Sequence, residues 1–574
     1  MKPSRLDVLL FLAFAVLFSV HAAPAAARAL CQLDPETKEN VAAALGLVRF
    51  DPSQIPQDIR EKLCSPKNSA AAFAQRSRFY LADVLANPDL FTPSYEERYQ
   101  ALMHFAKTQS AHQAYVMFDF LGADRSRGYR PVVAPANLQF PSDNAVDTES
   151  QFGWYYVVGN ATGDNGKRYG ILLMLYRRSL LSPPVAQHFG LSGTENQVVD
   201  MQLAITEAGD RNYQARPTIV AGTTGLIQLK PGTFYMTQGD NGVTSPDGAV
   251  VPMRLKAHGF DKGATPAVEL QIDLTFTAAK GYLYQGDAGC LPCCGDIGTL
   301  YYSIPHLTLD TSASTIKLKG ETIHLTAASF WLDHQRGTVG NVRVNALRAF
   351  GVTQESGPGG WDFFVAQFTG NRQMTFVGFH TNANAQFYGQ TSAQPPAGVM
   401  KVPVTGKYMD ANAVQVAAKG TLRVTDWVKS TTTPDPTQYA VTNTWYPNGW
   451  EFEFGPEVPA DIRTFSMRPI VSTGASLFFA LGHQYQEAPV DILDAGGAVV
   501  GSGYAEAVAY TSTVPVNKRN RLKLAGLPDS EAMLELVATT PPSAELIAEC
   551  QAYLAVPPHQ AELLAEISAC KGLD

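Results

Sequence analysis

The chain has 574 residues, with 44 Lys and Arg against 52 Asp and Glu, which gives a formal net charge of −8. The basic residues are scattered along the chain, so a nucleic-acid-binding surface is not expected. Only 17% of the residues are charged and 10% are aromatic, a balance that favours a β-rich protein with an aromatic interior. Because the length exceeds that of one ordinary domain, we expect three or four structural units.

Residues 1–27 have the pattern of a secretory signal peptide. Lys2 and Arg5 precede an apolar run over Val8–Val20, and small residues follow over 22–29. The apolar run is too short for a membrane helix, and no later run reaches the roughly 18 residues that a span needs. We therefore expect a secreted or periplasmic protein without an integral membrane span; a buried N-terminal helix is the alternative.

Helical patterns are expected at both ends of the mature chain. Within a predicted helical segment over 28–125, apolar residues recur at three-and-four spacing over 69–86 and 95–110. Over 528–574, two further helical patterns flank Val556-Pro-Pro. Since proline does not continue a helix, this tail is predicted to be a helical hairpin.

The seven cysteines form three groups: Cys31 and Cys64 near the N-terminus, Cys290, Cys293 and Cys294 in the middle, and Cys550 and Cys570 in the tail. Export favours disulfides, and each outer pair could join two short helices. The central group lies between glycines in a β region, where we favour a structural disulfide. Metal binding and redox catalysis are the alternatives, although a redox Cys-x-x-Cys normally opens a helix. The odd count leaves one thiol free or in an unusual bond.

Between the helical ends, short apolar runs are separated by turn residues. Runs beginning at Trp154 and Tyr169 read as strands, and Asp164-Asn-Gly and Pro447-Asn-Gly read as turns. Many such strands without intervening helices favour antiparallel sandwiches or barrels over parallel units. The predicted fold class is therefore mainly β and antiparallel.

Several common catalytic signatures are missing from the chain. There is no Gly-x-Ser-x-Gly, no His-Glu-x-x-His and no phosphate-binding loop. Their absence argues against a serine hydrolase, a zinc protease or a nucleotide hydrolase, although a triad needs no local motif.

The segment over 330–337 is the strongest candidate for a site. If it is a strand, its side chains alternate between two faces, with Trp331, Asp333 and Gln335 on one and Leu332, His334 and Arg336 on the other. A carboxyl beside an aromatic ring on the inner wall of a barrel would have a raised pKa and could deliver a proton. The alternative is a buried Asp333 that caps a turn or pairs with Arg336.

Four parts of the chain resemble the lipocalin-like superfamily of carotenoid 1,2-hydratase, the AttH-type secreted proteins and kievitone hydratase. These parts are 154–160 with 166–178, 301–305 with 330–337, 360–367, and 450–454 with 485–488 and 501–506. The resemblance implies two lipocalin-like antiparallel barrels, over 140–395 and 396–527, packed together with an apolar cleft at their junction.

The resemblance also implies acid-catalysed chemistry on a hydrophobic, unsaturated substrate of terpenoid or lipid-like type. A protonated Asp333 would donate to a carbon–carbon double bond, with Asp362 and Glu487 as alternative acids. Water would be steered by His334 or Tyr156 in a hydratase, isomerase or cyclase type of reaction that needs no metal or cofactor.

Aromatic side chains would bind the substrate and stabilise a cation through their π-faces. The substrate-binding candidates are Trp154, Tyr156, Tyr302, Trp331 and Trp361, and of these Tyr302, Trp331 and Trp361 would stabilise the cation. The alternative functions are a non-catalytic protein that binds a hydrophobic molecule and, third, a secreted hydrolase, for which the sequence offers no visible nucleophile.

Overall fold

The computed structural model describes residues 35–63, 129–130, 132, 135–179, 183–188, 190–245, 249–294, 297–338, 360–380, 382–430, 444–472, 476–480, 483–508 and 510. The predicted signal peptide, the helical patterns over 69–86 and 95–110, and the C-terminal hairpin lie outside these residues. Within the described ranges, no helix combines the length and apolar character needed to cross a membrane.

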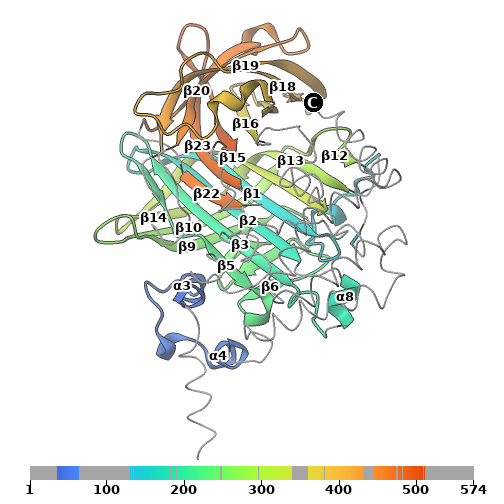
Figure 1. Cartoon of the computed structure of the whole chain (residues 1–574), viewed down its shortest axis with the longest axis vertical. Coiled ribbons are helices and arrows are strands. Elements are labelled where there is room, and N and C mark those ends of the chain that lie inside the picture. The colour runs from blue at the N-terminus through green and yellow to red at the C-terminus, as the bar shows by residue number, and fades with distance from the viewer. Residues whose placement is uncertain are drawn as a thin grey trace, which may run out of the picture.

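The described strands are antiparallel and form two sheets (Figure 1). The first sheet contains β1 (Phe152–Gly163), β2 (Arg168–Ser179), β3 (Gln197–Glu207), β4 (Asn212–Gln214), β5 (Thr218–Ala221), β6 (Ile227–Leu229), β7 (Tyr235–Gln238), β8 (Asn241–Thr244), β9 (Met253–Asp261), β10 (Val268–Ala279), β11 (Leu283–Tyr284), β12 (Cys290–Cys294), β13 (Ile297–Leu309), β14 (Thr315–Leu318) and β15 (Glu321–Thr338). The second contains β16 (Gly360–Phe368), β17 (Arg372–His380), β18 (Lys401–Met409), β19 (Gln415–Lys429), β20 (Trp445–Phe454), β21 (Thr464–Pro469), β22 (Ser476–Ala480), β23 (His483–Leu493) and β24 (Val499–Val508).

Helices are few and short in the described part of the chain. They are α3 (Pro35–Ala44), α4 (Gln57–Leu63) and α8 (Pro183–His188), with 3-10 turns at Pro52–Gln54, Ser142–Asn144, Gly222–Thr224, Asn382–Phe387 and Ala460–Ile462. Val41 and Ala44 of α3 and Leu63 of α4 join the hydrophobic core of the first sheet. These two helices therefore close one end of that sheet, as Figure 1 shows.

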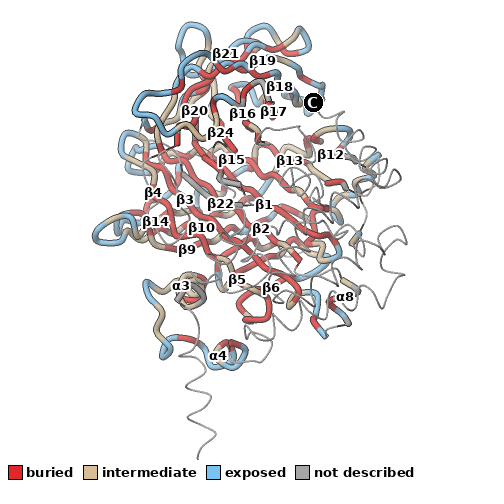
Figure 2. Tube along the Cα trace, in the orientation of Figure 1, coloured by how far each residue is buried: buried red, intermediate tan, exposed pale blue. Residues whose placement is uncertain are grey.

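The centre of the first sheet is buried on both faces. Strands β2, β1, β15 and β13 are consecutive neighbours, and β1, β2 and β3 are buried along almost their whole length (Figure 2). One face of these strands packs into the core of the first sheet and the other against the second unit. The expected turn at Asp164-Asn-Gly joins β1 to β2, where Gly166 has a φ of +75° that favours glycine.

The second sheet closes into an eight-stranded antiparallel barrel. Its order runs β21-β20-β19-β18-β17-β16-β24-β23, and β21 also pairs with β23. Phenylalanine rings fill its interior, with Phe364, Phe376 and Phe452 in mutual contact at centroid distances of 4.9 to 5.1 Å. Closure satisfies the backbone hydrogen bonds of both edges, so the barrel needs no further sheet partner.

The mainly β, antiparallel fold is confirmed: a large antiparallel sheet is followed by one closed barrel. The barrel begins at Gly360, earlier than the boundary expected after residue 395, because β16 pairs with β24. Pro447-Asn-Gly is not a turn, contrary to expectation. It lies within β20, where Pro447 and Gly449 face β19 across a register shift and the strand continues past the bulge.

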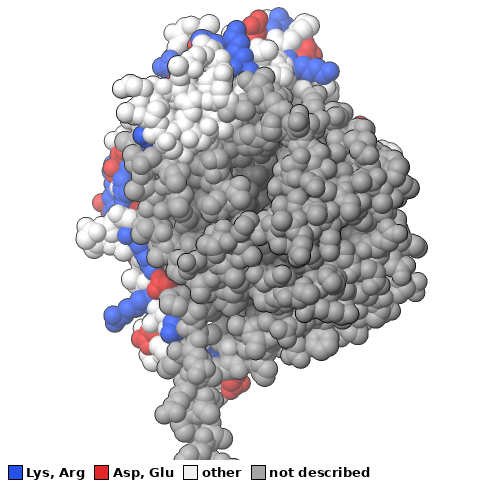
Figure 3. Space-filling view, in the orientation of Figure 1, with Lys and Arg blue, Asp and Glu red and all other residues white. Residues whose placement is uncertain are grey.

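The exposed charges of the described surface are mixed in sign. Figure 3 shows Lys and Arg side chains interspersed with Asp and Glu over the barrel and along the edge of the first sheet. Several of them form exposed cross-strand ion pairs, such as Arg254 with Asp273 and Arg423 with Glu451.

Candidate functional site

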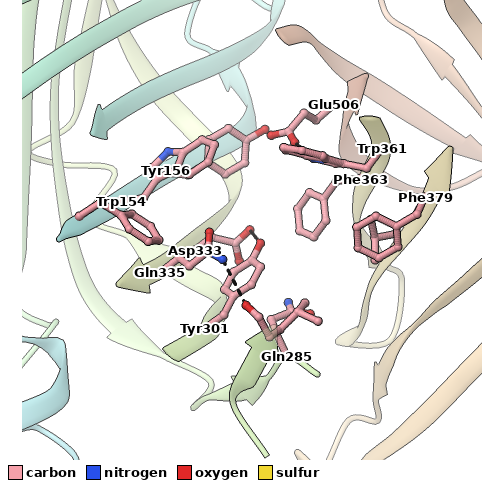
Figure 4. Close-up of a pocket in the computed structure, with 13 residues that line it drawn as sticks. Trp154, Tyr156, Gln285, Tyr301, Asp333, Gln335, Trp361, Phe363, Phe379 and Glu506 are labelled. Carbon is pink, nitrogen blue, oxygen red and sulfur yellow. Dashed lines mark hydrogen bonds between the residues drawn. The ribbon is translucent and has the colours of Figure 1, made fainter. Parts of the chain in front are cut away.

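A cavity of about 220 Å³ lies where the first sheet meets the outer wall of the barrel. Figure 4 shows Trp154, Tyr156 and Tyr301 of the first sheet facing Trp361 and Phe363 of the barrel. The lining is mostly aromatic, and it comes from strands of both sheets. The candidate site therefore lies between the two units, at the junction where the family resemblance implied an apolar cleft, and not on the inner wall of a barrel.

Strand register places the site residues of the first sheet in rows. Asp333 on β15 lies between Tyr156 on β1 and Ser303 on β13. In the next row, Gln335 lies between Trp154 and Tyr301. Directly opposed residues of antiparallel strands share a face, so all of these side chains point toward the barrel.

The side chains of β15 alternate between the two faces of the sheet, as predicted. Asp333 and Gln335 line the cavity, and Trp331 packs in the hydrophobic cluster at the junction. Leu332 packs in the core of the first sheet, on the opposite face.

Asp333 is buried and accepts three hydrogen bonds. Tyr301 Oη donates to Oδ2 at 3.0 Å, Trp331 Nε1 donates to Oδ1 at 2.7 Å, and Ser303 Oγ also donates to Oδ1. Burial raises the pKa of Asp333, and the three donors oppose that effect, so the pKa is raised to about 6. Asp333 thus titrates close to neutral pH while it faces an apolar cavity.

Two further carboxyls approach from the barrel. Glu487 on β23 and Glu506 on β24 are direct cross-strand partners, and both are buried. Tyr156 Oη donates to Glu487 Oε2 at 2.7 Å, and Trp361 Nε1 donates to Glu506 Oε1 at 2.6 Å. Burial and their mutual repulsion raise the pKa of Glu487 well above its ordinary value, and burial raises that of Glu506 to about 7.

None of these carboxyls has a cationic neighbour that offsets its burial. Neither Lys nor Arg is among the described residues that line the cavity. The influences on the pKa of Asp333, Glu487 and Glu506 are burial, hydrogen bonds and other carboxyls. The site is therefore an apolar space lined by two acids, Asp333 and Glu506, with Glu487 next to Glu506, and burial favours the protonated form of each.

His334 and Tyr302 do not reach this cavity, contrary to their predicted roles. They are register partners on the opposite face of the sheet, where Tyr302 Oη lies 2.9 Å from His334 Nδ1. The rings of Tyr155 and His334 are in contact, with their centroids 4.4 Å apart and their planes tilted by 34°. Burial, helped by Arg336 and Arg177, holds the pKa of His334 well below its ordinary value, so the imidazole is neutral. Both side chains belong to the core of the first sheet.

Asp362 also points away from the cavity. It lies on the interior side of β16, where Tyr510 Oη donates to its two oxygens at 3.1 and 3.2 Å. Its neighbour Trp361 points out of the barrel and lines the cavity. Neighbouring side chains on a strand point to opposite faces, so Trp361 and Asp362 cannot both face the cavity. Asp362 is therefore not an alternative acid for this site.

Arg336 does not pair with Asp333. Its guanidinium binds Asp143 and Asp147 on the other face of β15, with 2.8 Å between Nη1 and Asp147 Oδ2. The interpretation of Asp333 as one half of a structural ion pair is therefore wrong. Among the predicted binding residues, Trp154, Tyr156 and Trp361 line the cavity, whereas Trp331 lies behind Asp333 and holds it.

The cysteine strand β12 lies beside the site. Cys290 is buried and disulfide-bonded, and Leu291 lines the cavity. The side chains of the other six cysteines lie outside the described residues, so their pairing remains a prediction. In the part of the chain that the structure describes, no group of three or more His, Cys, Asp or Glu is arranged to hold a metal ion.

Sequence reasoning missed several residues of the site, and its polar ones include Gln285, Tyr301 and Glu506. Gln285 Nε2 donates to Ser303 Oγ at 2.7 Å and so orients a donor of Asp333. Tyr301 could have been preferred over Tyr302 only if the register between β13 and β15 had been known. Glu506 belongs to the segment 501–506 that carried the family resemblance, but its raised pKa depends on burial at the junction, where it is the cross-strand partner of Glu487.

Comparisons with known proteins identify the family. The AttH-like family model matches residues 131–510. No curated protein matches the chain. Similar solved structures include one assigned as an AttH from Nitrosomonas europaea, at 16% identity and a TM-score of 0.45 over 66% of this chain and 99% of that one. Kievitone hydratase from Nectria haematococca is similar at 12% identity and a TM-score of 0.42, over 67% and 97% of the two chains. Both scores are too low to support a conclusion, but the family model covers well over half of the sequence, and the chain therefore belongs to the AttH-like family.

Proposed function

We propose that this protein is an enzyme that transfers protons to and from a hydrophobic, unsaturated substrate in the junction cavity. The reaction would be of hydratase, isomerase or cyclase type. One observation carries the proposal: the buried carboxyls Asp333 and Glu506 line an aromatic cavity, Glu487 is the cross-strand partner of Glu506, and no Lys or Arg is among the described lining residues. Such acids keep protons near neutral pH, and catalytic groups are often tuned in this way.

The aromatic lining supports a cationic reaction path. Protonation of a carbon–carbon double bond leaves positive charge on carbon, and the rings of Trp154, Trp361 and Tyr301 line the space where that charge would develop. Aromatic faces attract cations most strongly where water is excluded. The same lining would bind a substrate that is otherwise apolar.

The dimensions and charge of the cavity restrict the substrate. Sites for drug-sized ligands commonly measure about 300–1,000 Å³, so a cavity of about 220 Å³ suits a small molecule or the reacting end of a longer one. An anionic group would meet Asp333 and Glu506 without a compensating cation. The proposed substrate is therefore neutral at the end that enters the site.

The test is incubation of the full-length mature protein with neutral lipid and terpenoid extracts, followed by mass spectrometry of bound and altered species. Hydration adds the mass of one water, and isomerisation or cyclisation changes retention without changing mass. Asp333→Asn should abolish conversion, whereas Asp240→Asn, at an exposed turn, should leave it unchanged. Unaltered ligand recovered from both proteins would instead identify a binding protein, and conversion by Asp333→Asn would exclude the role of that carboxyl.

We also propose that the chain is exported, as its first 27 residues suggest. The disulfide at Cys290 suits an oxidising compartment. Expression of the full-length chain in a Gram-negative host, with fractionation and N-terminal sequencing, tests this. A periplasmic or secreted product cleaved near residue 27 is expected, and an uncleaved cytoplasmic product would contradict export.

A further inference from the structure

We infer that Glu487 and Glu506 form a dyad that shares one proton and supplies it to the substrate, while Asp333 is the carboxylate that accepts one. This inference rests on the proposed function and assigns the direction of proton transfer within it. It reverses the role that the sequence suggested for Asp333.

Glu487 and Glu506 lie side by side on neighbouring strands. Glu487 and Glu506 face each other directly across β23 and β24, on the wall that packs against the first sheet. Both are buried, and the charge of Glu506 opposes the ionisation of Glu487. Two adjacent carboxylates in a low-dielectric space repel strongly, so one proton must remain on the pair.

The hydrogen bonds around the dyad do not compensate two negative charges. Glu506 Oε1 accepts from Trp361 Nε1, and Glu487 Oε2 accepts from Tyr156 Oη. Glu487 Oε1 is buried and has no donor among the described residues. A proton held between the two carboxyls supplies the missing donor.

Compared with the dyad, Asp333 has surroundings that favour its ionised form. Its oxygens accept from Trp331, Tyr301 and Ser303, and the indole N–H of Trp331 can act only as a donor. Hydrogen bonds to the charged form lower a carboxyl pKa. Asp333 accepts three hydrogen bonds on two oxygens, whereas the dyad accepts two from Tyr156 and Trp361 on four oxygens, so Asp333 is the better proton acceptor and the dyad the better donor.

Their positions suit these opposite roles. Asp333 lines the cavity from the first sheet and Glu506 from the barrel, on either side of the space in Figure 4. A substrate between them would present one carbon to Glu506 and the neighbouring carbon to a water at Asp333. Glu487 lies behind Glu506 and, through Tyr156, is fixed to the first sheet.

Hydration would take place in two proton transfers. The π electrons of the double bond take the proton of the dyad and form a new C–H bond, which leaves the dyad with one more negative charge. A water oxygen then bonds to the cationic carbon and loses one proton to the Asp333 carboxylate. The product is substrate plus one water, and the site is restored when Asp333 releases its proton to solvent and the dyad takes one up.

The dyad can be tested without any substrate. Infrared spectra of the mature protein, recorded against pH, should contain a protonated carboxyl band that persists at pH 7 and is shifted or lost in both Glu487→Gln and Glu506→Gln at that pH. Glu453→Gln, on an exposed position of the same barrel, is the matched control and should retain the band. If the band at pH 7 is absent from the wild type, or unchanged in both dyad variants, the shared proton does not exist.

Kinetics then test the direction of transfer. Activity should rise as pH passes the pKa of Asp333 and fall as it passes that of the dyad. Glu506→Gln should reduce kcat at least about 100-fold. Glu487→Gln leaves Glu506 without a second carboxylate with which to share the proton, so it should move the alkaline limb down by roughly one pH unit.

The two proposals fail in different ways. Wild-type turnover with an unshifted alkaline limb in Glu487→Gln would overturn the dyad and leave the enzyme assignment intact. The infrared band without turnover of any extract component would overturn the enzyme assignment and leave the shared proton intact. Loss of the acid limb, with the alkaline limb retained, in the residual activity of Glu506→Gln would reverse the two roles.

Discussion

Tyr156 of the first sheet donates a hydrogen bond of 2.7 Å to Glu487 of the barrel. Tyr156 is also the cross-strand partner of Asp333. Tyr156 therefore lies beside Asp333 of the first sheet and also binds the dyad of the barrel. The relative position of the two units consequently determines the pKa values of the carboxyls at the cavity.

Removal of this hydroxyl should shift the dyad without destroying the fold. In Tyr156→Phe, Glu487 loses a donor that lowers its pKa, so the alkaline limb of the pH–rate profile should move to higher pH, opposite to Glu487→Gln. A buried hydrogen bond lost in this way costs about 1 kcal/mol of unfolding free energy. Tyr504→Phe is the control, since the buried Tyr504 hydroxyl has no partner among the described residues. A shift of equal size in both variants would contradict the prediction.

The charge of the cavity predicts discrimination between neutral and anionic ligands. An unsaturated alcohol should bind at least about tenfold more tightly at pH 8 than the acid of the same chain, because the carboxylate would meet Asp333 and Glu506 unpaired. The difference should shrink at pH 5, where ligand and site are protonated. Quenching of Trp154 and Trp361 fluorescence, which line the cavity, measures both affinities. Equal affinity at pH 8 would show that the acids do not govern binding.

The buried dyad should make the fold less stable as pH rises. The folded pKa of Glu506 is raised from its ordinary 4.5 to about 7, so the folded state binds more protons than the unfolded state in that window, and the contribution is lost as pH increases. Each pKa unit corresponds to about 1.4 kcal/mol. Glu506→Gln should therefore gain unfolding free energy relative to wild type between pH 5 and pH 8 in urea titrations.

The difference between variant and wild type is the quantity to measure in that experiment. Asp147 and Glu207 have lowered pKa values and contribute in the opposite sense. Glu453→Gln supplies the baseline for an exposed glutamate. A variant curve parallel to that of wild type would mean that Glu506 ionises as freely in the folded as in the unfolded state.

The junction itself depends on a close approach between the two units. A Cβ added to Gly170 on β2 would lie 2.2 Å from Cγ of Pro489 on β23, so Gly170→Ala should push the barrel away from the first sheet. Overpacking of this kind costs roughly 1–3 kcal/mol. Gly193→Ala, where the added atom meets Thr148 at 3.4 Å, is the control. Equal melting temperatures for both variants would show that the junction yields without cost.

Some of the fold could be predicted from the sequence because its causes are local. The apolar runs and turn residues gave the strands of the first sheet, including the turn at Asp164-Asn-Gly. The assignment failed at Pro447-Asn-Gly, where pairing with β19 overrides the local turn preference. It also placed the start of the barrel after residue 395, because nothing local records that β16 pairs with β24.

The candidate site divides in the same way. Trp331, Asp333 and Gln335 could be assigned to one face because successive residues of any strand alternate. The same rule separates Trp361 from Asp362, but it does not say which face meets a cavity. The choice between Tyr301 and Tyr302 depends on the register of β13 against β15.

By itself, the sequence determined a mainly antiparallel β protein with an aromatic surface around Asp333, since alternation and turn chemistry act between near neighbours. Only the tertiary structure decided that Glu487 and Glu506 face each other, and that Tyr156 reaches across 331 positions of the chain to bind one of them. The reason is physical: a carboxyl acquires its pKa from burial and from neighbours in space, and those neighbours meet only when the barrel closes and packs on the first sheet.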